Sequence, residues 1–222
     1  MLITIIVSVC ASGLLIFAGW LLLRHPASRG SRAATSPSGE LTGWDLRSMA
    51  FHEAGHAVCS FFLPEREKLL VVTISPSSEA FGMIRTSPRP HHNETRTSLS
   101  GTIAVLLAGR IAEEMFLNVV TTSCVHDLAA ARQLAFDMVR KFGMGESLGL
   151  SAPGGEIPSE QEVADIRRIL LDSERQARKL LTEHAAATKL LAETLLRERT
   201  IRDDRLEAFF AAAEKYPKTE TR

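Results

Sequence analysis

The sequence predicts a mainly α-helical fold with a small β-sheet, preceded by one transmembrane helix. Alanine and leucine are abundant and aromatic residues make up only 6% of the 222 residues, a composition that favours helices over a β-sandwich. Lys and Arg total 26, as do Asp and Glu, so the net charge gives no reason to expect a nucleic-acid partner. Three scattered cysteines are too few for a disulfide framework, which is consistent with a reducing compartment.

The first 24 residues predict a membrane anchor. Residues 2–23 contain no charged side chain, and a helix of that length is about 30 Å long, enough to cross a bilayer. Trp20 and Arg24 lie where such a span would meet the membrane surface. A cleaved signal peptide is the weaker alternative, because no Lys or Arg precedes the apolar run. The basic residues after the span predict a single-pass protein whose remaining chain, residues 25–222, faces the cytoplasm.

The remaining chain divides into a linker and one folded domain. Residues 25–43 are mostly small and polar, which predicts a flexible linker. The domain is expected over residues 44–216, and its last part, about 160–212, has the charged, leucine-rich pattern of a helical bundle that packs on the core. Apolar residues that recur every three to four positions predict three earlier helices, over about 44–63, 97–117 and 128–142.

The stretch His52-Glu53-Ala54-Gly55-His56 lies in the first of these helices. Two histidines four residues apart share one helix face, so both can bind one tetrahedral zinc ion. Glu53 would stand beside the metal, where it can take a proton from an activated water and pass it to a leaving amine. Ala54 and Gly55 are small enough to let another element approach this face. The alternative is that both histidines line a core helix and Glu53 faces water.

The spacing of residues leaves the third zinc ligand open. Such a site takes a further donor from a separate segment. The candidates are Glu113 and Glu114, which lie in an otherwise apolar helix, and His126 and Asp127, which begin the next one. Each has an ordinary structural explanation as well, such as a salt bridge for a glutamate or an N-cap for Asp127. Cys59 is interpreted as a small buried residue and not as a ligand.

Two short β-branched stretches, residues 69–74 and 81–86, predict a pair of strands. An edge strand beside a metal could hold an extended peptide by main-chain hydrogen bonds. The pair could equally be a hairpin that only covers the core, and the sequence does not decide between the two.

Together these features resemble the proteolytic domain of the FtsH family of membrane-bound zinc metalloproteases. The matching stretches, spread over roughly residues 47–211, are 51–57, 71–76, 108–114, 121–122, 127–128, 142–144 and 148–149. The resemblance implies that Asp127 is the third zinc ligand beside His52 and His56, that Glu53 is the base, and that Glu113 is not a ligand. It also implies a small sheet whose edge holds substrate, and assembly into a ring of six.

Two departures from the family pattern matter. No Gly-x-x-x-x-Gly-Lys-[Ser/Thr] motif occurs, and residues 24–46 leave no room for the AAA ATPase module of the family. We therefore expect no nucleotide site and no ATP-driven unfolding in this chain. Near Asp127, Ser123 and His126 stand where the family usually has Gly and Asn.

The sequence thus predicts a membrane-anchored zinc endopeptidase of the His-Glu-x-x-His type. It would hydrolyse peptide bonds in membrane-associated or unfolded proteins, with one zinc per chain, as a homo-oligomeric ring or together with an ATPase-bearing partner. The alternative is a non-proteolytic adaptor or regulatory partner of a full-length FtsH-type protease. The missing ATPase motivates that alternative, whereas the intact ligand set and base argue against it.

Overall fold

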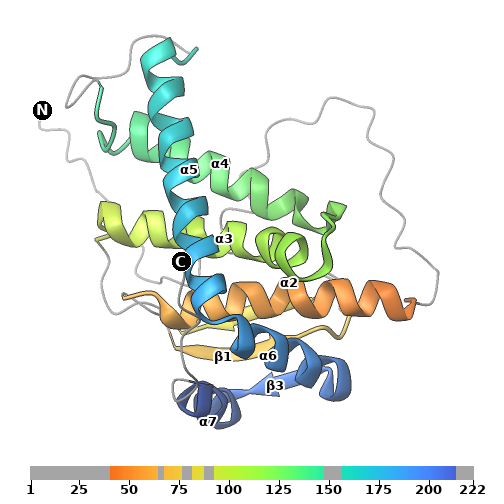
Figure 1. Ribbon diagram of the computed structural model, residues 1–222. Helices are drawn as coiled ribbons and strands as arrows, with labels where there is room; N and C mark the ends of the chain where they lie inside the picture. The colour runs from red at the N-terminus through yellow and green to blue at the C-terminus, as the bar shows by residue number, and fades with distance from the viewer. Residues whose placement is uncertain (1–40, 65–67, 77–81, 88–92, 148–156, 214–222) are drawn as a thin grey trace, which may run out of the picture. The chain divides into compact units, whose positions relative to one another are not determined.

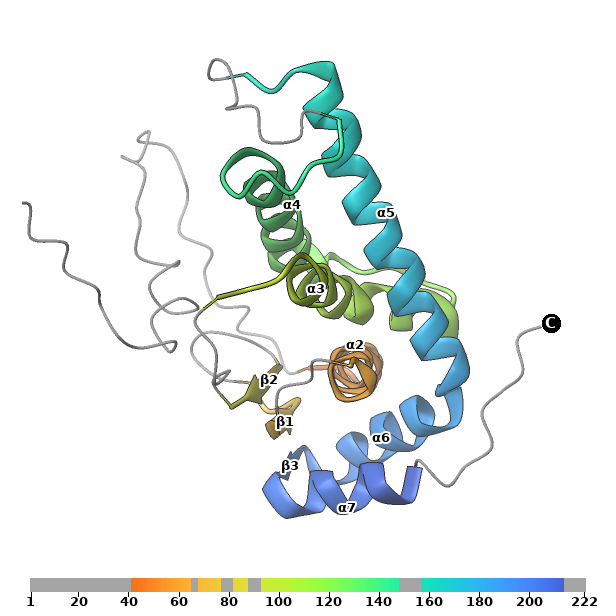
Figure 2. The same ribbon diagram turned by 90° about the vertical axis from the view of Figure 1, so that its left-hand side faces the viewer.

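The histidine-bearing helix α2 (Gly43–Phe62) lies at the centre of the described part of the fold (Figure 1). The computed structural model describes residues 41–64, 68–76, 82–87, 93–147 and 157–213. Thr42, which the sequence places at the end of the linker, caps α2 through a reciprocal pair of hydrogen bonds with Asp45. Residues 48–60 are all buried, because neighbours cover α2 on several sides. Figure 2 shows α2 end-on, between α3 and α6 and beside the strands.

A three-stranded antiparallel sheet lies against α2. Its strands are β1 (Leu69–Thr73), β2 (Met83–Thr86) and β3 (Thr200–Arg202), in the order β2-β1-β3. The first two strands are those that the sequence predicts. The third strand was not predicted: it pairs with β1 across more than a hundred residues, Val72 with Ile201. β1 is therefore the central strand, with β3 from the C-terminal part of the domain at one edge and β2 at the other.

Two further helices complete the surroundings of the histidines. Helix α3 (Arg96–Leu117) packs along α2 and ends at Asn118, which adopts a left-handed conformation with φ 56°. A short 3-10 turn, η1 (Thr122–Cys124), then leads into α4 (Val125–Arg140). This connection brings the first turn of α4 back towards α2, which is where Asp127 lies.

The C-terminal helices cover different parts of the domain. Helix α5 (Glu160–Glu183) crosses α3 and α4, α6 (Ala185–Glu198) packs on α2, and α7 (Asp203–Ala213) packs on β1. The apolar face of α5 is buried at Ile169, Ala177 and Leu181, as the helical periodicity predicts. The described part of the chain is thus mainly helical with a small sheet, which confirms the predicted fold class of the domain.

The predicted membrane anchor is a separate matter. Residues 1–24 and most of the linker at 25–43 lie outside the described residues. Among the helices that are described, none combines the length and the hydrophobicity that crossing a bilayer requires.

Candidate metal centre

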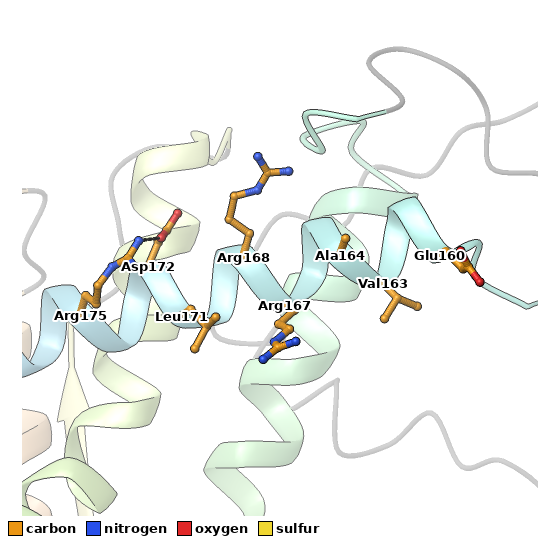
Figure 3. Close-up of a pocket in the computed structure, with 8 residues that line it drawn as sticks. All are labelled: Glu160, Val163, Ala164, Arg167, Arg168, Leu171, Asp172 and Arg175. Atoms are coloured by element: carbon orange, nitrogen blue, oxygen red, sulfur yellow. Dashed lines mark hydrogen bonds and ion pairs between the residues drawn. The ribbon is translucent and has the colours of Figure 1, made fainter.

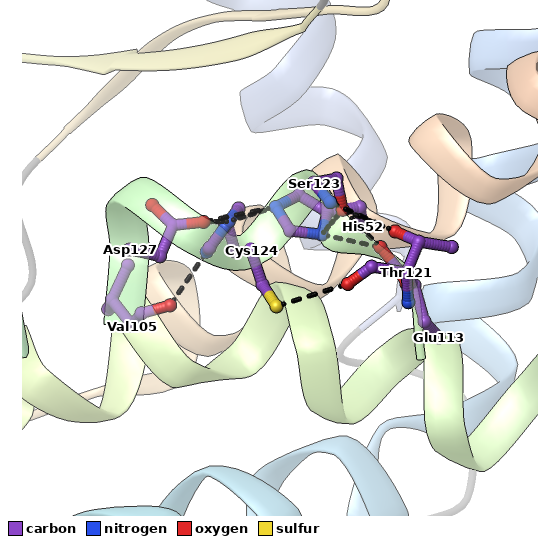
Figure 4. Close-up of polar contacts among 8 residues, drawn as sticks. His52, Val105, Glu113, Thr121, Ser123, Cys124 and Asp127 are labelled. Carbon is purple, nitrogen blue, oxygen red and sulfur yellow. Dashed lines mark hydrogen bonds and ion pairs between the residues drawn. The ribbon is translucent and has the colours of Figure 1, made fainter. Parts of the chain in front are cut away.

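Two imidazoles and one carboxylate meet at the buried face of α2. His52 and His56 are 5% and 7% exposed, and their Nε2 atoms lie 3.0 Å apart. Asp127, in the first turn of α4, places its Oδ2 atom 3.2 Å from Nε2 of His52 (Figure 4). The same Oδ2 atom lies 3.4 Å from Nε2 of His56. Within the described ranges, these three residues are the group of potential metal ligands whose donor atoms converge.

The spacing of the three donor atoms suits zinc. Tetrahedral zinc holds nitrogen and oxygen ligands at about 2.0–2.1 Å, so its ligand atoms lie about 3.3–3.4 Å from one another. The observed separations of 3.0, 3.2 and 3.4 Å form a triangle of that size. One ion could therefore contact all three atoms without a rearrangement of α2 or α4.

The outer nitrogen atoms of both rings are already engaged. Nδ1 of His56 lies 2.7 Å from the carbonyl oxygen of Val105, which can only accept, so Nδ1 carries the proton. Nδ1 of His52 donates to Glu113 Oε1 at 2.8 Å. In the neutral rings both Nε2 atoms then present lone pairs towards Asp127 Oδ2, and three acceptors facing one another require a cation. Metal-binding histidines are typically held in this way by their second nitrogen.

The electrostatics of the centre favour positive charge between its acids. Burial opposes a charged His52, but the hydrogen bonds with Asp127 and Glu113 outweigh it and raise the pKa of His52 to about 10. Burial likewise opposes a charged Asp127, yet the two histidines hold the pKa of Asp127 well below its usual value. Both shifts show that these acids stabilise a cation among them, whether a proton or a metal ion.

Glu53 lies beside the three donor residues, and none of them donates a hydrogen bond that would stabilise the charged carboxylate of Glu53. Its side chain is buried, with the residue 7% exposed, and burial raises its pKa above the ordinary value. Its carboxylate lies against Gly82, the residue before β2: a Cβ atom added at Gly82 would lie 2.5 Å from Oε1 of Glu53. Glu53 therefore lies between the metal centre and the start of strand β2.

The other candidates for the third ligand point elsewhere. Glu113 is fully buried and faces the outer nitrogen of His52, away from the donor triangle. The side chain of Glu114 is 42% exposed and pairs with Arg110 and Arg178, and His126 is exposed. Cys59 is buried, which raises its pKa to about 12 and disfavours the thiolate that zinc needs. Of the four candidates that the spacing left open, the structure brings only Asp127 to the two histidines.

Ser123, which departs from the family pattern, forms a hydrogen bond with Glu113 next to the metal centre. Its hydroxyl group donates to Glu113 Oε1 at 2.7 Å, and the backbone N–H of Thr121 donates to Glu113 Oε2 at 2.8 Å. The turn before α4 is therefore tied to the acid that orients His52.

Sequence reasoning missed the residues that make room for the centre. Gly82 and Gly109 both lie against site atoms, and the only signal in the sequence was a glycine inside a predicted strand or helix. The expected close approach at Gly55 is found: a Cβ there would lie 2.5 Å from the carbonyl oxygen of Ala108 in α3.

A surface depression of about 380 Å³ lies elsewhere, along the outer face of α5 (Figure 3). Its lining consists of Glu160, Val163, Ala164, Arg167, Arg168, Leu171, Asp172 and Arg175. All of these residues belong to one helix and none belongs to the metal centre, so the depression is a surface groove and adds nothing to the donor set.

A helical domain with two histidines one turn apart, a distant aspartate and a buried neighbouring glutamate has the features of a zinc metalloprotease. Residues 41–209 match the family model described as peptidase family M41. The chain belongs to this family, which confirms the resemblance to the FtsH proteolytic domain.

Relatives from bacteria and animals agree with this assignment. The chain is 33% identical over 174 residues to the ATP-dependent zinc metalloprotease FtsH of Cupriavidus metallidurans, covering 71% of this chain and 27% of the relative. It is 32% identical over 200 residues to the ATP-dependent zinc metalloprotease YME1 homolog of Caenorhabditis elegans, covering 82% and 27%. For the human ATP-dependent zinc metalloprotease YME1L1 the identity is 34% over 160 residues, covering 68% and 21%. The chain thus matches only about a quarter of the length of these relatives.

Proposed function

We propose that this domain is a zinc-dependent endopeptidase in which His52, His56 and Asp127 bind the metal and Glu53 is the general base. The observation that carries the proposal is the meeting of three donor atoms within 3.4 Å of one another, each ring fixed through its other nitrogen. With both Nδ1 atoms engaged, two neutral rings and Asp127 would turn three acceptor atoms towards one another, an arrangement that a metal ion satisfies.

The chemistry divides between the metal and the chain. Zinc in this donor set supplies a Lewis acid that lowers the pKa of water and polarises a peptide carbonyl group. Glu53 removes a proton from the attacking water and delivers it to the leaving amine, and its raised pKa makes its carboxylate a better proton acceptor. Glu113 and Val105 keep both Nε2 atoms unprotonated and turned inward.

The sheet supplies a place for an extended substrate. Among the described strands, β2 pairs with β1 on one side and has no strand on the other, so its free edge can bind a peptide by main-chain hydrogen bonds. Because Gly82 leads into β2 and touches Glu53, a peptide along that edge passes next to the base. Substrates are therefore expected to be unfolded or extended polypeptides.

We further propose that residues 1–24 anchor the domain in a membrane and that the domain faces the cytoplasm. The uncharged run at 2–23 and the arginines after it support this arrangement. The relatives are named ATP-dependent, whereas this chain carries no Walker-type motif. We therefore propose action on membrane-associated or already unfolded proteins, alone as a ring or together with an ATPase-bearing chain.

The test is Glu53→Gln in the full chain purified from membranes. We expect about one zinc per chain in wild type and variant alike, and loss of cleavage of an unstructured protein by at least about 100-fold in the variant. Glu193→Gln, which alters an exposed acid on α6, is the matched control and should behave as wild type. Equal cleavage by wild type and Glu53→Gln would remove Glu53 from the mechanism. A wild type that binds zinc and cleaves nothing would favour the adaptor alternative.

A further inference from the structure

Gly109 lies in the middle of α3, directly against the two proposed zinc-binding nitrogens. A Cβ atom at this position would lie 2.5 Å from Nε2 of His56 and 2.7 Å from Nε2 of His52. Carbon and nitrogen atoms that are not bonded rarely approach within about 3.0 Å. No larger residue therefore fits at position 109 while both rings keep their present positions.

The backbone gives no reason for a glycine at this place. Glycine is a poor helix former, and alanine is the best. Gly109 lies within α3 and is not among the described residues with positive φ, so its conformation is open to any residue. The three atoms nearest to an added Cβ all belong to His52 and His56. The glycine is thus explained by the space that the rings need.

The rings cannot easily move aside, because α3 itself holds them. Val105 and Glu113, which accept from Nδ1 of His56 and His52, lie one turn before and one turn after Gly109 on the same face of α3. The helices cannot easily separate either, since Gly55 of α2 packs directly against the backbone of Ala108. One face of α3 therefore holds the Nδ1 atoms of both rings by hydrogen bonds and leaves space for their Nε2 atoms.

We propose that Gly109 is a positioning residue of the metal centre: the absence of a side chain there lets both Nε2 atoms face the metal while α3 holds both Nδ1 atoms. This inference rests on the proposed zinc site and deepens it. A methyl group at position 109 turns at least one ring away from the donor triangle and weakens metal binding.

The experiment compares Gly109→Ala with Gly101→Ala in the full chain. Gly101 lies in the same helix, but a Cβ there would make only ordinary contacts of 3.5 and 3.7 Å with the side chain of Leu63. Zinc affinity is measured by competition with a chelator, and thermal unfolding is measured on the zinc-free proteins. We expect Gly101→Ala to bind zinc as wild type does, and Gly109→Ala to bind it at least about 10-fold more weakly. Equal affinities of the two variants would overturn the inference.

A second background keeps the test decisive if Gly109→Ala does not fold. With His52 and His56 both replaced by Ala, the atoms that an added Cβ would meet are gone. Gly109→Ala should then fold and unfold at an equal or higher temperature than its parent, as expected for alanine in a helix. Failure to fold in this background would show that something other than the rings excludes a side chain. A wild type without zinc affinity would instead overturn the zinc site itself, and this inference with it.

Discussion

Glu113 is a buried acid on which the orientation of His52 depends, and Glu113→Gln tests that dependence. The residue is 0% exposed. Its Oε1 atom accepts hydrogen bonds from His52 Nδ1 at 2.8 Å and from the Ser123 hydroxyl group at 2.7 Å, and Oε2 accepts from the Thr121 N–H at 2.8 Å. Burial by itself would raise the pKa of Glu113, but these hydrogen bonds outweigh it and lower the pKa, so the side chain is an anion at neutral pH.

Glutamine has the same size but only one acceptor oxygen. If that oxygen takes the place of Oε1, the amide NH2 group faces the N–H of Thr121. If it takes the place of Oε2, the NH2 group faces Nδ1 of His52 and favours the tautomer that carries its proton on Nε2. Ser123 can rotate its hydroxyl group to adapt, but a backbone N–H cannot. Either orientation leaves an N–H without an acceptor or gives the wrong tautomer of His52.

The loss of one acceptor oxygen in Glu113→Gln sets the expected effects on stability and on zinc affinity. One unsatisfied donor lowers the free energy of unfolding of the zinc-free protein by about 1–3 kcal/mol. Loss of the acid that orients a metal-binding histidine weakens metal binding by about 10- to 100-fold. Cleavage at limiting zinc should fall in proportion to the zinc that remains bound.

Urea unfolding followed by circular dichroism and zinc competition with a chelator measure the two effects separately. Glu114→Gln is the matched control, because Glu114 is the next residue in α3, is 42% exposed and only pairs with Arg110 and Arg178 on the surface. Such exposed pairs contribute at most about 1 kcal/mol. If Glu113→Gln and Glu114→Gln changed zinc affinity and stability equally, the orienting role of Glu113 would be refuted.

Two further predictions concern the base and the acid stability of the domain. Gly82→Ala should displace the carboxylate of Glu53, since the added Cβ would lie 2.5 Å from Oε1. We expect unchanged zinc content and a kcat that is at least about 10-fold lower. The control is Gly43→Ala, whose added Cβ would have nothing within 4 Å and which should match wild type. Asp165 is buried, which acts to raise its pKa, but hydrogen bonds from Ser147 outweigh this and lower it. The stability that Asp165 contributes is therefore present above its unfolded pKa of about 3.9 and lost as the pH falls through its lower folded pKa. Urea midpoints should fall less between pH 5 and pH 2 in Asp165→Asn than in wild type, and an identical fall would contradict this reading.

The elements that the sequence predicted are those whose signals are local. Helices α2, α3 and α4 follow from apolar residues at three- and four-residue spacing, and β1 and β2 from short β-branched runs. Strand β3 has only three residues, too few for any periodicity, and it exists because β1 offers a pairing edge. It is bracketed by Arg199 and Asp203, two residues with positive φ, which no sequence pattern marks.

The metal centre also combines features that local sequence signals predict with features that depend on tertiary packing. The two imidazoles share one helix, so their spacing of four residues was enough to pair them. The third donor depends on where α4 begins relative to α2, which is why spacing alone could not separate Asp127 from His126. The supports at positions 105, 109 and 113 also recur every four residues, but one of them acts through a backbone carbonyl group and another through an absent side chain. Their roles become visible only when the register between α2 and α3 is known, and the close contact of Gly55 with Ala108 fixes that register. A substitution at Gly55 should therefore disturb both histidines at once, although Gly55 contributes no donor atom to the centre.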